Sequence, residues 1–141
     1  MPIFGGVREE TLNFLLGLAG QVSRRKDEFF FKENEPGNSL FVLEEGKVAV
    51  LKAWQGRQHL LRILNRGDCF GEMAIMDLLP RSASLRAEED CSAIEITASD
   101  LYRLYKQDVE QFAVIQMNVA RELSRRLRQA DELLFHANVD D

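Results

Sequence analysis

The chain is poor in the residues that stabilise small secreted domains or bind metals. Its 141 residues include only two cysteines and two histidines. Cys69 and Cys91 are too few for a four-thiolate site, and such a pair without a secretory leader is typical of reduced thiols in a cytoplasmic protein. His59 and His136 are too few for a metal enzyme built on strands. We therefore expect no metal site, and no Ser, His and Asp arrangement indicates a hydrolase.

Long apolar runs and excess basic charge are also missing. Arg8, Glu9 and Glu10 interrupt the first sixteen residues, which argues against a signal peptide or a membrane span there. Lys and Arg number 18 against 23 Asp and Glu, so the net charge is −5, and the isoelectric point is near 5.1. A field of this sign repels polyanions, so we expect neither nucleic acid nor membrane as a direct partner.

Length and composition fit one domain over residues 1–141. With 45% hydrophobic and 29% charged residues, the chain has the composition of ordinary globular proteins. A chain of this size buries roughly 68% of the surface that its unfolded form exposes. It therefore needs neither a metal nor a disulfide for stability.

The spacing of apolar residues divides the chain into three zones. Leu12, Leu15 and Leu16 share one helical face and predict a short leading helix. From about 21 to 97, short apolar runs alternate with Gly, Pro, Asn and Asp, a rhythm typical of all-β structure. Strands are expected over 40–43, 47–54, 58–64, 82–88 and 91–96. Their inward positions are predicted to be Val48, Val50, Leu61, Ile63, Leu85 and Ile94.

The expected fold is mainly β with flanking helices, a double-stranded β-helix or jelly roll whose short strands close on themselves. Residues 70–79 contain no Pro and no Gly after Gly71 and are rich in helix formers, which predicts a short helix between strands. Two helices follow at about 98–135. Capping-box spacing marks their starts, at Thr97 with Asp100 and at Asp108 with Gln111.

The last helix, at about 109–135, carries one apolar stripe at steps of three and four. The stripe consists of Phe112, Ile115, Val119, Leu123, Leu127, Ala130 and Leu134. A helix of about 27 residues is roughly 40 Å long, which is longer than the expected body. We therefore expect part of the stripe to overhang and to pair with a second copy, making a homodimer. The alternative is a monomer in which the stripe packs on the β-body alone.

The segment 66–87 carries the chemistry. Gly71 lets the backbone approach a ligand, and a helix that begins near Glu72 points unpaired N–H groups forward, as anion sites do. Arg81 adds a charge that suits a phosphate, and Ser82 adds a hydroxyl. Glu72 would repel an anion, but it accepts a hydrogen bond from a sugar hydroxyl. The set predicts a ribose phosphate with a single negative charge.

This segment resembles the phosphate-binding cassette of cyclic nucleotide-binding domains, particularly sensors of the Crp/Fnr type. The family pattern runs F-G-E, then a small apolar residue, then P-R-x-A-[ST]. It is matched by Phe70-Gly71-Glu72, by Ala74 and by Pro80-Arg81-Ser82-Ala83-Ser84. The resemblance covers about 21–134 and implies a regulatory domain that binds cAMP or cGMP, has no cofactor and catalyses no reaction.

The resemblance also implies a role for each residue. Glu72 is expected to hold the ribose 2′-hydroxyl, and Arg81 is expected to pair with the cyclic phosphate. Val50 and Leu61 form the apolar wall beside sugar and base, and the long helix is the lid. Further phosphate contacts are implied for Gly71, Met73, Ala74, Ser82 and Ala83.

The contact with the base stays open. An ungapped match puts Arg126 and Leu127 where a relative of the Crp type reads adenine with a Thr-Ser pair. Arg125 or Arg126 would instead stack on the base or bond its ring nitrogens. The alternative is a salt-bridged helix face, because Glu122 stands three and four residues before these arginines. Ser82 stands where cGMP-dependent kinases favour threonine, which favours cAMP over cGMP.

A hypothesis from another class also stays open. No helix-turn-helix follows the long helix, so we expect no DNA reading by this chain. Leu78 and Leu79 precede Pro80 where many relatives have glycine, which would alter the loop. A docking or dimerisation module that has lost its nucleotide is therefore the alternative to a sensor that signals by moving its long helix.

Overall fold

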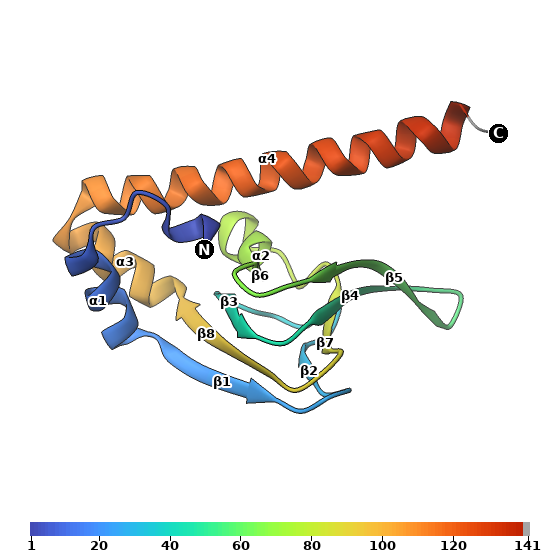
Figure 1. The fold of residues 1–141 in the computed structure, drawn as a ribbon, viewed down its shortest axis with the longest axis horizontal. Helices are drawn as coiled ribbons and strands as arrows, with labels where there is room; N and C mark the ends of the chain where they lie inside the picture. Colours follow the sequence, from blue (N-terminus) through green and yellow to red (C-terminus); the bar gives the residue numbers. More distant parts are fainter. Residues whose placement is uncertain (140–141) are drawn as a thin grey trace.

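Eight short strands build the body of the computed structural model, which describes residues 1–139. They are β1 (Gly20–Arg24), β2 (Phe29–Phe31), β3 (Ser39–Glu45), β4 (Val48–Trp54), β5 (Arg57–Leu64), β6 (Cys69–Phe70), β7 (Ser84–Ala87) and β8 (Cys91–Thr97). All pairings are antiparallel, in two sheets of order β1-β8-β3-β6 and β2-β7-β4-β5. The expected jelly roll is confirmed (Figure 1).

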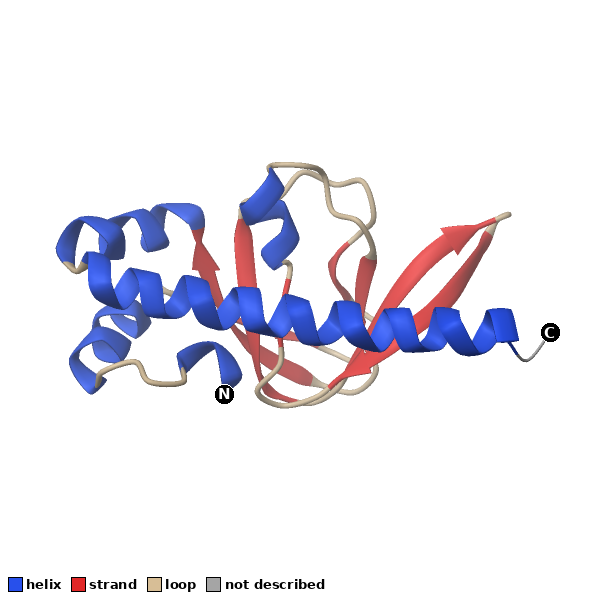
Figure 2. Cartoon of the chain, turned by 90° about the horizontal axis from the view of Figure 1, so that it is seen from above, coloured by secondary structure: helices blue, strands red, loops and turns tan. Residues whose placement is uncertain are grey.

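The helices flank this roll. They are the 3-10 turn η1 (Pro2–Phe4), α1 (Glu9–Leu18), α2 (Glu72–Asp77), α3 (Ala98–Gln107) and α4 (Val109–Val139). In Figure 1, α1 and α3 lie at one end of the roll and α4 runs above it. Figure 2 shows that α4 crosses the whole length of the molecule, with α2 on one side of it and η1 on the other. None of the helices within residues 1–139 is long and apolar enough to cross a membrane.

The aromatic core between the sheets is centred on three phenylalanines. Phe30, Phe41 and Phe70 come from β2, β3 and β6, and their ring centroids lie 5.1 to 5.7 Å apart. Val48, Val50 and Leu85 join the same buried cluster, as expected for inward positions. A second cluster lies between the roll and the helices, where Leu40, Val42, Leu101, Leu104, Ile115 and Val119 are buried together.

The prediction of inward side chains on β5 is wrong. Leu61 is 50% exposed and Ile63 is 38% exposed. β5 is an edge strand that pairs only with β4, and its ladder carries an irregularity between Val50 and Leu51. Because the β4–β5 hairpin projects beyond the core, only Leu64 of this strand is buried.

The capping predictions differ in outcome. Thr97 and Asp100 form the expected reciprocal box, in which each side chain accepts the other's backbone N–H. Asp108 accepts from the backbone N–H of Gln111 at 3.2 Å. The side chain of Gln111 instead accepts from the backbone N–H of Arg8 at 2.8 Å. The second box is thus half formed, and its other half anchors the N-terminal segment to α4.

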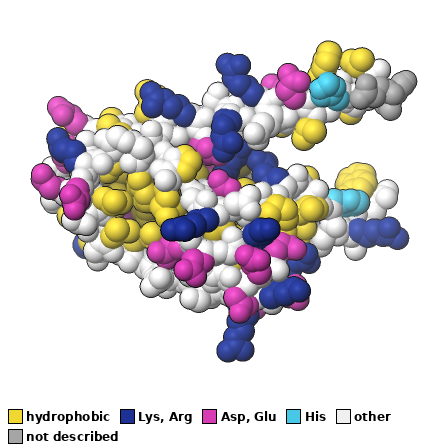
Figure 3. Space-filling model, viewed as in Figure 1, with side chains coloured by type: hydrophobic (Ala, Val, Ile, Leu, Met, Phe, Trp, Pro, Cys, Tyr) yellow, Lys and Arg dark blue, Asp and Glu magenta, His cyan; other side chains and the backbone are white. Residues whose placement is uncertain are grey.

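α4 is longer than expected, and its C-terminal half extends past the other described elements. Ile115 and Val119 are buried, but every described side chain after Arg126 is exposed. Leu127 and Leu134 of the apolar stripe are each 62% exposed. Figure 3 shows this part of the helix standing clear of the β4–β5 hairpin. The expected overhang is therefore present.

Candidate functional site

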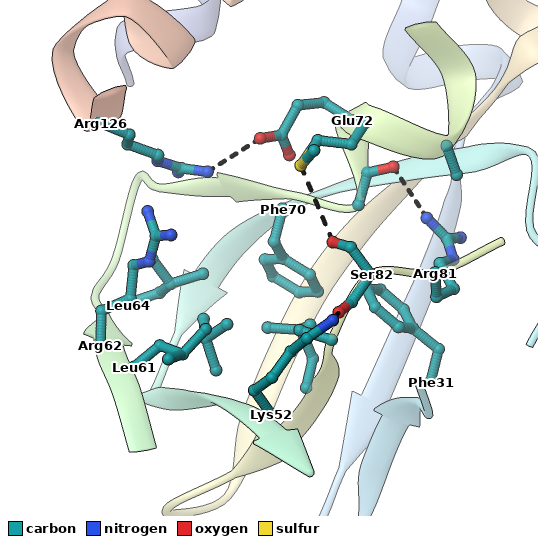
Figure 4. Close-up of a pocket in the computed structure, with 16 residues that line it drawn as sticks. Phe31, Lys52, Leu61, Arg62, Leu64, Phe70, Glu72, Arg81, Ser82 and Arg126 are labelled. Carbon is teal, nitrogen blue, oxygen red and sulfur yellow. Dashed lines mark hydrogen bonds and ion pairs between the residues drawn. The ribbon is translucent and has the colours of Figure 1, made fainter. Parts of the chain in front are cut away.

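A cavity of about 270 Å³ lies between the β-roll, α2 and α4 (Figure 4). Its lining comes from separate parts of the chain, because β4, β5 and β7 form one wall and α2 and α4 the other. All the site residues expected from the sequence line it except Arg125. Those that do are Val50, Leu61, Gly71, Glu72, Met73, Ala74, Arg81, Ser82, Ala83 and Arg126.

Arg81 is a buried cation at one end of this cavity. Arg81 is only 5% exposed, and its guanidinium forms no ion pair with any residue between 1 and 139. Nη1 donates to the carbonyl oxygen of Gly71 at 2.8 Å, and the guanidinium carbon lies 4.1 Å from the ring centre of Phe31. Nε is buried with no partner among the described residues. Burial lowers the pKa of Arg81, and the charges of Glu95, Glu72 and Glu35 partly offset this effect.

Two glycines make room for this arginine. A Cβ atom on Gly37 would lie 2.2 Å from Arg81 Nε, and one on Gly71 would lie 2.7 Å from Arg81 Nη1. Gly71 also has a φ of 82°, in the left-handed region, at the start of α2. Glycine is the residue that adopts this conformation without strain. Close approach and backbone conformation therefore both require glycine at position 71.

Glu72 is the buried carboxylate of the site, and its side chain is already paired with an arginine. Glu72 is 4% exposed, and its Oε1 accepts from Arg126 Nη1 at 2.9 Å. Arg126 Nε also donates to Oε1 of the buried Glu122 at 3.1 Å. Burial raises the pKa of Glu72, and the charge of Arg126 partly offsets this effect. The result is an ion-pair cluster that joins α2 to α4.

The two candidate base-contacting arginines lie on different faces of α4. Arg126 faces the cavity, with its side chain 13% exposed. Arg125 faces away from it; its side chain is 55% exposed and pairs with Glu122. The salt-bridged interpretation is therefore the right one for Arg125, and the expectation that it lines the site is wrong. Arg126 lines the cavity, but it too bonds carboxylates.

The remaining cassette residues lie at the Arg81 end. Ser82 Oγ lies 3.8 Å from the sulfur of Met73, and the carbonyl oxygen of Ser82 accepts from Lys52 Nζ at 2.6 Å. Lys52 also pairs with Glu33 at 3.2 Å. Leu61, although wrongly predicted as a core residue, lines the cavity with Val50 as the expected apolar wall.

Several residues that line the cavity carry no signal in the sequence. Phe31, Lys52 and Arg62 come from strands outside the cassette. They carry no motif, and only the packing of β2, β4 and β5 brings them to the site. β5 contributes Leu61, Arg62 and Leu64 to the cavity, and because two of these are consecutive, no alternation pattern marks its cavity-facing side.

No cluster of three or more His, Cys, Asp or Glu within residues 1–139 is arranged to hold a metal ion. Cys69 and Cys91 are both buried and free. Burial, with the charge of Glu72, raises the pKa of the Cys69 thiol to about 12, so this thiol is neutral and a poor metal ligand.

Comparison with known proteins agrees with this geometry. Residues 21–108 match the model of the cyclic nucleotide-binding domain family. The chain is 30% identical over 131 residues to the cyclic AMP receptor protein of Thermus thermophilus, covering 92% of this chain and 59% of that protein. It is 32% identical over 133 residues to a CRP-like cAMP-activated global transcriptional regulator of Mycobacterium tuberculosis, covering 94% and 58%. The chain thus spans less than two thirds of these relatives.

Solved structures share the fold of this chain. The crystal structure of the Thermus thermophilus catabolite activator protein superposes with a TM-score of 0.84 at 28% identity, covering 98% of this chain and 63% of that one. A cyclic nucleotide-binding domain from Methylobacillus flagellatus gives a TM-score of 0.86 at 24% identity, covering 93% and 75%.

Proposed function

Because the chain belongs to the cyclic nucleotide-binding domain family, with homologues of the Crp/Fnr type, we propose that it binds a 3′,5′-cyclic nucleotide in this cavity. In this proposal it acts as a regulatory domain and not as an enzyme. The observation that carries the proposal is Arg81, a buried guanidinium on the cavity wall with no ion pair in residues 1–139. A cyclic phosphodiester carries one negative charge, and this charge would be the direct counter-ion of Arg81.

The phosphate and the sugar then have separate binding groups. Arg81 and the hydroxyl of Ser82 bind the phosphate oxygens, with backbone N–H groups at Gly71, Met73, Ala74 and Ala83. Glu72 accepts the ribose 2′-hydroxyl. A carboxylate has about four lone-pair positions on two oxygens, so Glu72 can accept from the ribose while it keeps its bond to Arg126.

The bond between Glu72 and Arg126 gives the ligand a route to α4. A ribose hydroxyl that donates to Glu72 shares the carboxylate that also accepts from Arg126, and so couples the ligand to the position of this arginine. Arg126 belongs to the helix whose side chains from 127 to 139 are all exposed. Nucleotide binding would therefore favour one position of α4 over another, which is a population shift.

These contacts do not distinguish one purine from the other. Ser82 favours cAMP, as do the names of the curated relatives, two of which are a cyclic AMP receptor protein and a cAMP-activated regulator. We accordingly take cAMP as the first ligand to test and cGMP as the second.

Calorimetric titration and thermal unfolding with each nucleotide test the proposal. At a concentration about 100 times its dissociation constant, a ligand stabilises the folded state by about 2.7 kcal/mol. Arg81→Ala leaves a buried phosphate without its counter-charge, at a cost of about 2 to 5 kcal/mol, so it should weaken binding more than tenfold. Arg103→Ala, on the exposed face of α3, is the matched control and should bind like wild type.

The same samples separate the alternative function. If neither nucleotide changes the unfolding temperature, the docking-module hypothesis is favoured over the sensor. Hydrogen exchange of the α4 amides, measured with and without ligand, tests the proposed signal. Binding with unchanged exchange would overturn the role of α4 alone.

A further inference from the structure

Glu95 is a charged residue at an inward position of the roll. It lies on β8 opposite Phe41 of β3, and residues that are opposite in a ladder share one face of the sheet. Phe41 belongs to the aromatic core between the sheets. So do Cys91 and Ala93, which precede Glu95 on β8 at steps of two. Acidic residues on such a face usually have a partner there, so the position of Glu95 points to a group that needs its charge.

Ser39 is the residue that Glu95 bonds. It is 4% exposed, and its hydroxyl donates to Glu95 Oε2 at 2.7 Å. Glu95 forms no ion pair with residues 1–139. An ionised carboxylate only accepts hydrogen bonds, and a hydroxyl has one proton. Because that proton is directed at Glu95, Ser39 Oγ presents only its lone pairs to any other neighbour.

Arg81 is that other neighbour. Its Nη2 donates to Ser39 Oγ at 3.5 Å, while its Nη1 donates to the carbonyl oxygen of Gly71 at 2.8 Å. The guanidinium carbon lies 4.1 Å from the ring centre of Phe31, which is beside Arg81 in Figure 4. These contacts hold both terminal nitrogens and one face of the group. A guanidinium has five N–H groups, so others remain for an acceptor in the cavity.

Under the proposed function, on which this inference rests, that acceptor is the phosphate. We propose that Ser39 and Glu95 are positioning residues for Arg81. Glu95 takes the hydroxyl proton of Ser39, and the lone pairs of Ser39 Oγ then hold the guanidinium in one orientation toward the phosphate. The charge of Glu95 also acts on Arg81 directly, since it is the largest of those that offset the lowering of the Arg81 pKa by burial.

Ser39→Ala tests the contact with Arg81. It removes the oxygen that accepts from Nη2, so affinity for cAMP should fall by about 2- to 12-fold, the effect of one hydrogen bond. Ser92→Ala removes a hydroxyl from β8 outside the cavity and should bind like wild type. Titration calorimetry measures all three proteins.

A matched pair of variants at position 95 tests the role of Glu95. Glu95→Gln and Glu95→Leu both remove the charge, but only glutamine keeps an oxygen that accepts the proton of Ser39. We expect Glu95→Leu to bind cAMP about 2- to 12-fold more weakly than Glu95→Gln. When Ser39→Ala is added to each, the two should bind alike, because residues that act through one another are not additive.

Phosphorothioate analogues of cAMP separate positioning from a loss of folding. In the two diastereomers, sulfur replaces one or the other of the two non-bridging phosphate oxygens. A guanidinium held in one orientation meets these positions unequally, so wild type should prefer one diastereomer. The preference should shrink in Ser39→Ala and in Glu95→Leu, whereas partial unfolding would weaken both diastereomers alike.

Equal cAMP affinity in wild type and Ser39→Ala would overturn the inference and leave the proposed function standing. The same holds if wild type does not distinguish the diastereomers, or if Ser39→Ala keeps the wild-type preference. A difference between Glu95→Leu and Glu95→Gln that persists without the Ser39 hydroxyl would overturn the role of Glu95. If wild type binds neither cAMP nor cGMP, the proposed function fails, and the inference fails with it.

Discussion

Glu72 is the one carboxylate among the described residues that line the cavity, and its ionisation decides whether a ribose hydroxyl finds a strong acceptor. Burial raises its pKa, with partial compensation from Arg126. The free protein therefore begins to protonate Glu72 at a higher pH than an exposed glutamate would. Below that pKa, binding through the carboxylate must also remove a proton.

We expect nucleotide affinity to fall as the pH is lowered through the raised pKa of Glu72. For one proton, the limiting slope is about tenfold in the dissociation constant per pH unit. Titration calorimetry between neutral pH and the acid limit of folding measures it. In Glu72→Gln the slope should disappear, because an amide does not titrate there. The same slope in wild type and Glu72→Gln would contradict this role for the carboxylate.

At the scale of single residues, the sequence predicted the parts of the site that are adjacent in the chain. Residues 70–83 carry a motif, so the sequence alone points to Glu72 and Arg81. Arg62 was not identified, because its place in the cavity depends on the pairing of β4 with β5. Arg125 and Arg126 are neighbours in sequence, and only the rotation of α4 against α2 decides which one reaches Glu72.

At the scale of elements, α2 ends in a strained conformation. Leu78 has a φ of 59° and a ψ of 20°, and its N–H donates to the carbonyl oxygen of Ala74 at 3.1 Å. Leu78 is 86% exposed, so its side chain contributes little packing to offset the strain. The left-handed region costs a residue with a Cβ roughly 1 to 2 kcal/mol. A glycine, which has no Cβ, would adopt this conformation without that cost.

Leu78→Gly should therefore stabilise the protein. Relief of the strain exceeds the entropy that glycine loses on folding, so we expect the free energy of unfolding to rise by about 0.5 to 1 kcal/mol. Urea unfolding measures the change. Leu79→Gly is the control, because Leu79 is also exposed but does not have a positive φ, and it should not stabilise. Equal effects at both positions would mean that strain at Leu78 is not the cause.

The strands that sequence patterns missed are those too short or too polar to show a period. β6 has two residues, and β1 contains one large apolar side chain among five residues. β2 is Phe29–Phe31, an apolar run without alternation. β5 was identified, but its inward face was not, because an edge strand that extends past the core has no buried side. Local pattern predicts an element when that element has one face on the core.

Across the whole molecule, α4 connects the site to the exposed side chains of its own C-terminal half. Its first half packs on the roll through Ile115 and Val119, and Arg126 bonds Glu72 at the point where packing ends. Beyond this point the helix continues for 13 residues to Val139, which is roughly 20 Å. A change at Glu72 therefore acts on Arg126, at the boundary between the packed and the exposed half of α4.

We predict that the exposed half of α4 packs against the same helix of a second copy of the chain. Leu127 and Leu134 stand seven residues apart, the spacing of a helix pair, and each is 62% exposed. We expect a dimer in sedimentation experiments, with an unfolding temperature that rises with protein concentration. Leu127→Asp combined with Leu134→Asp should yield monomers that still bind nucleotide, because neither residue lines the cavity. Gln129→Asp adds a charge on the opposite face of α4 and should leave the dimer intact. A monomeric wild type at all accessible concentrations would refute the pairing, as would equal dissociation in both variants.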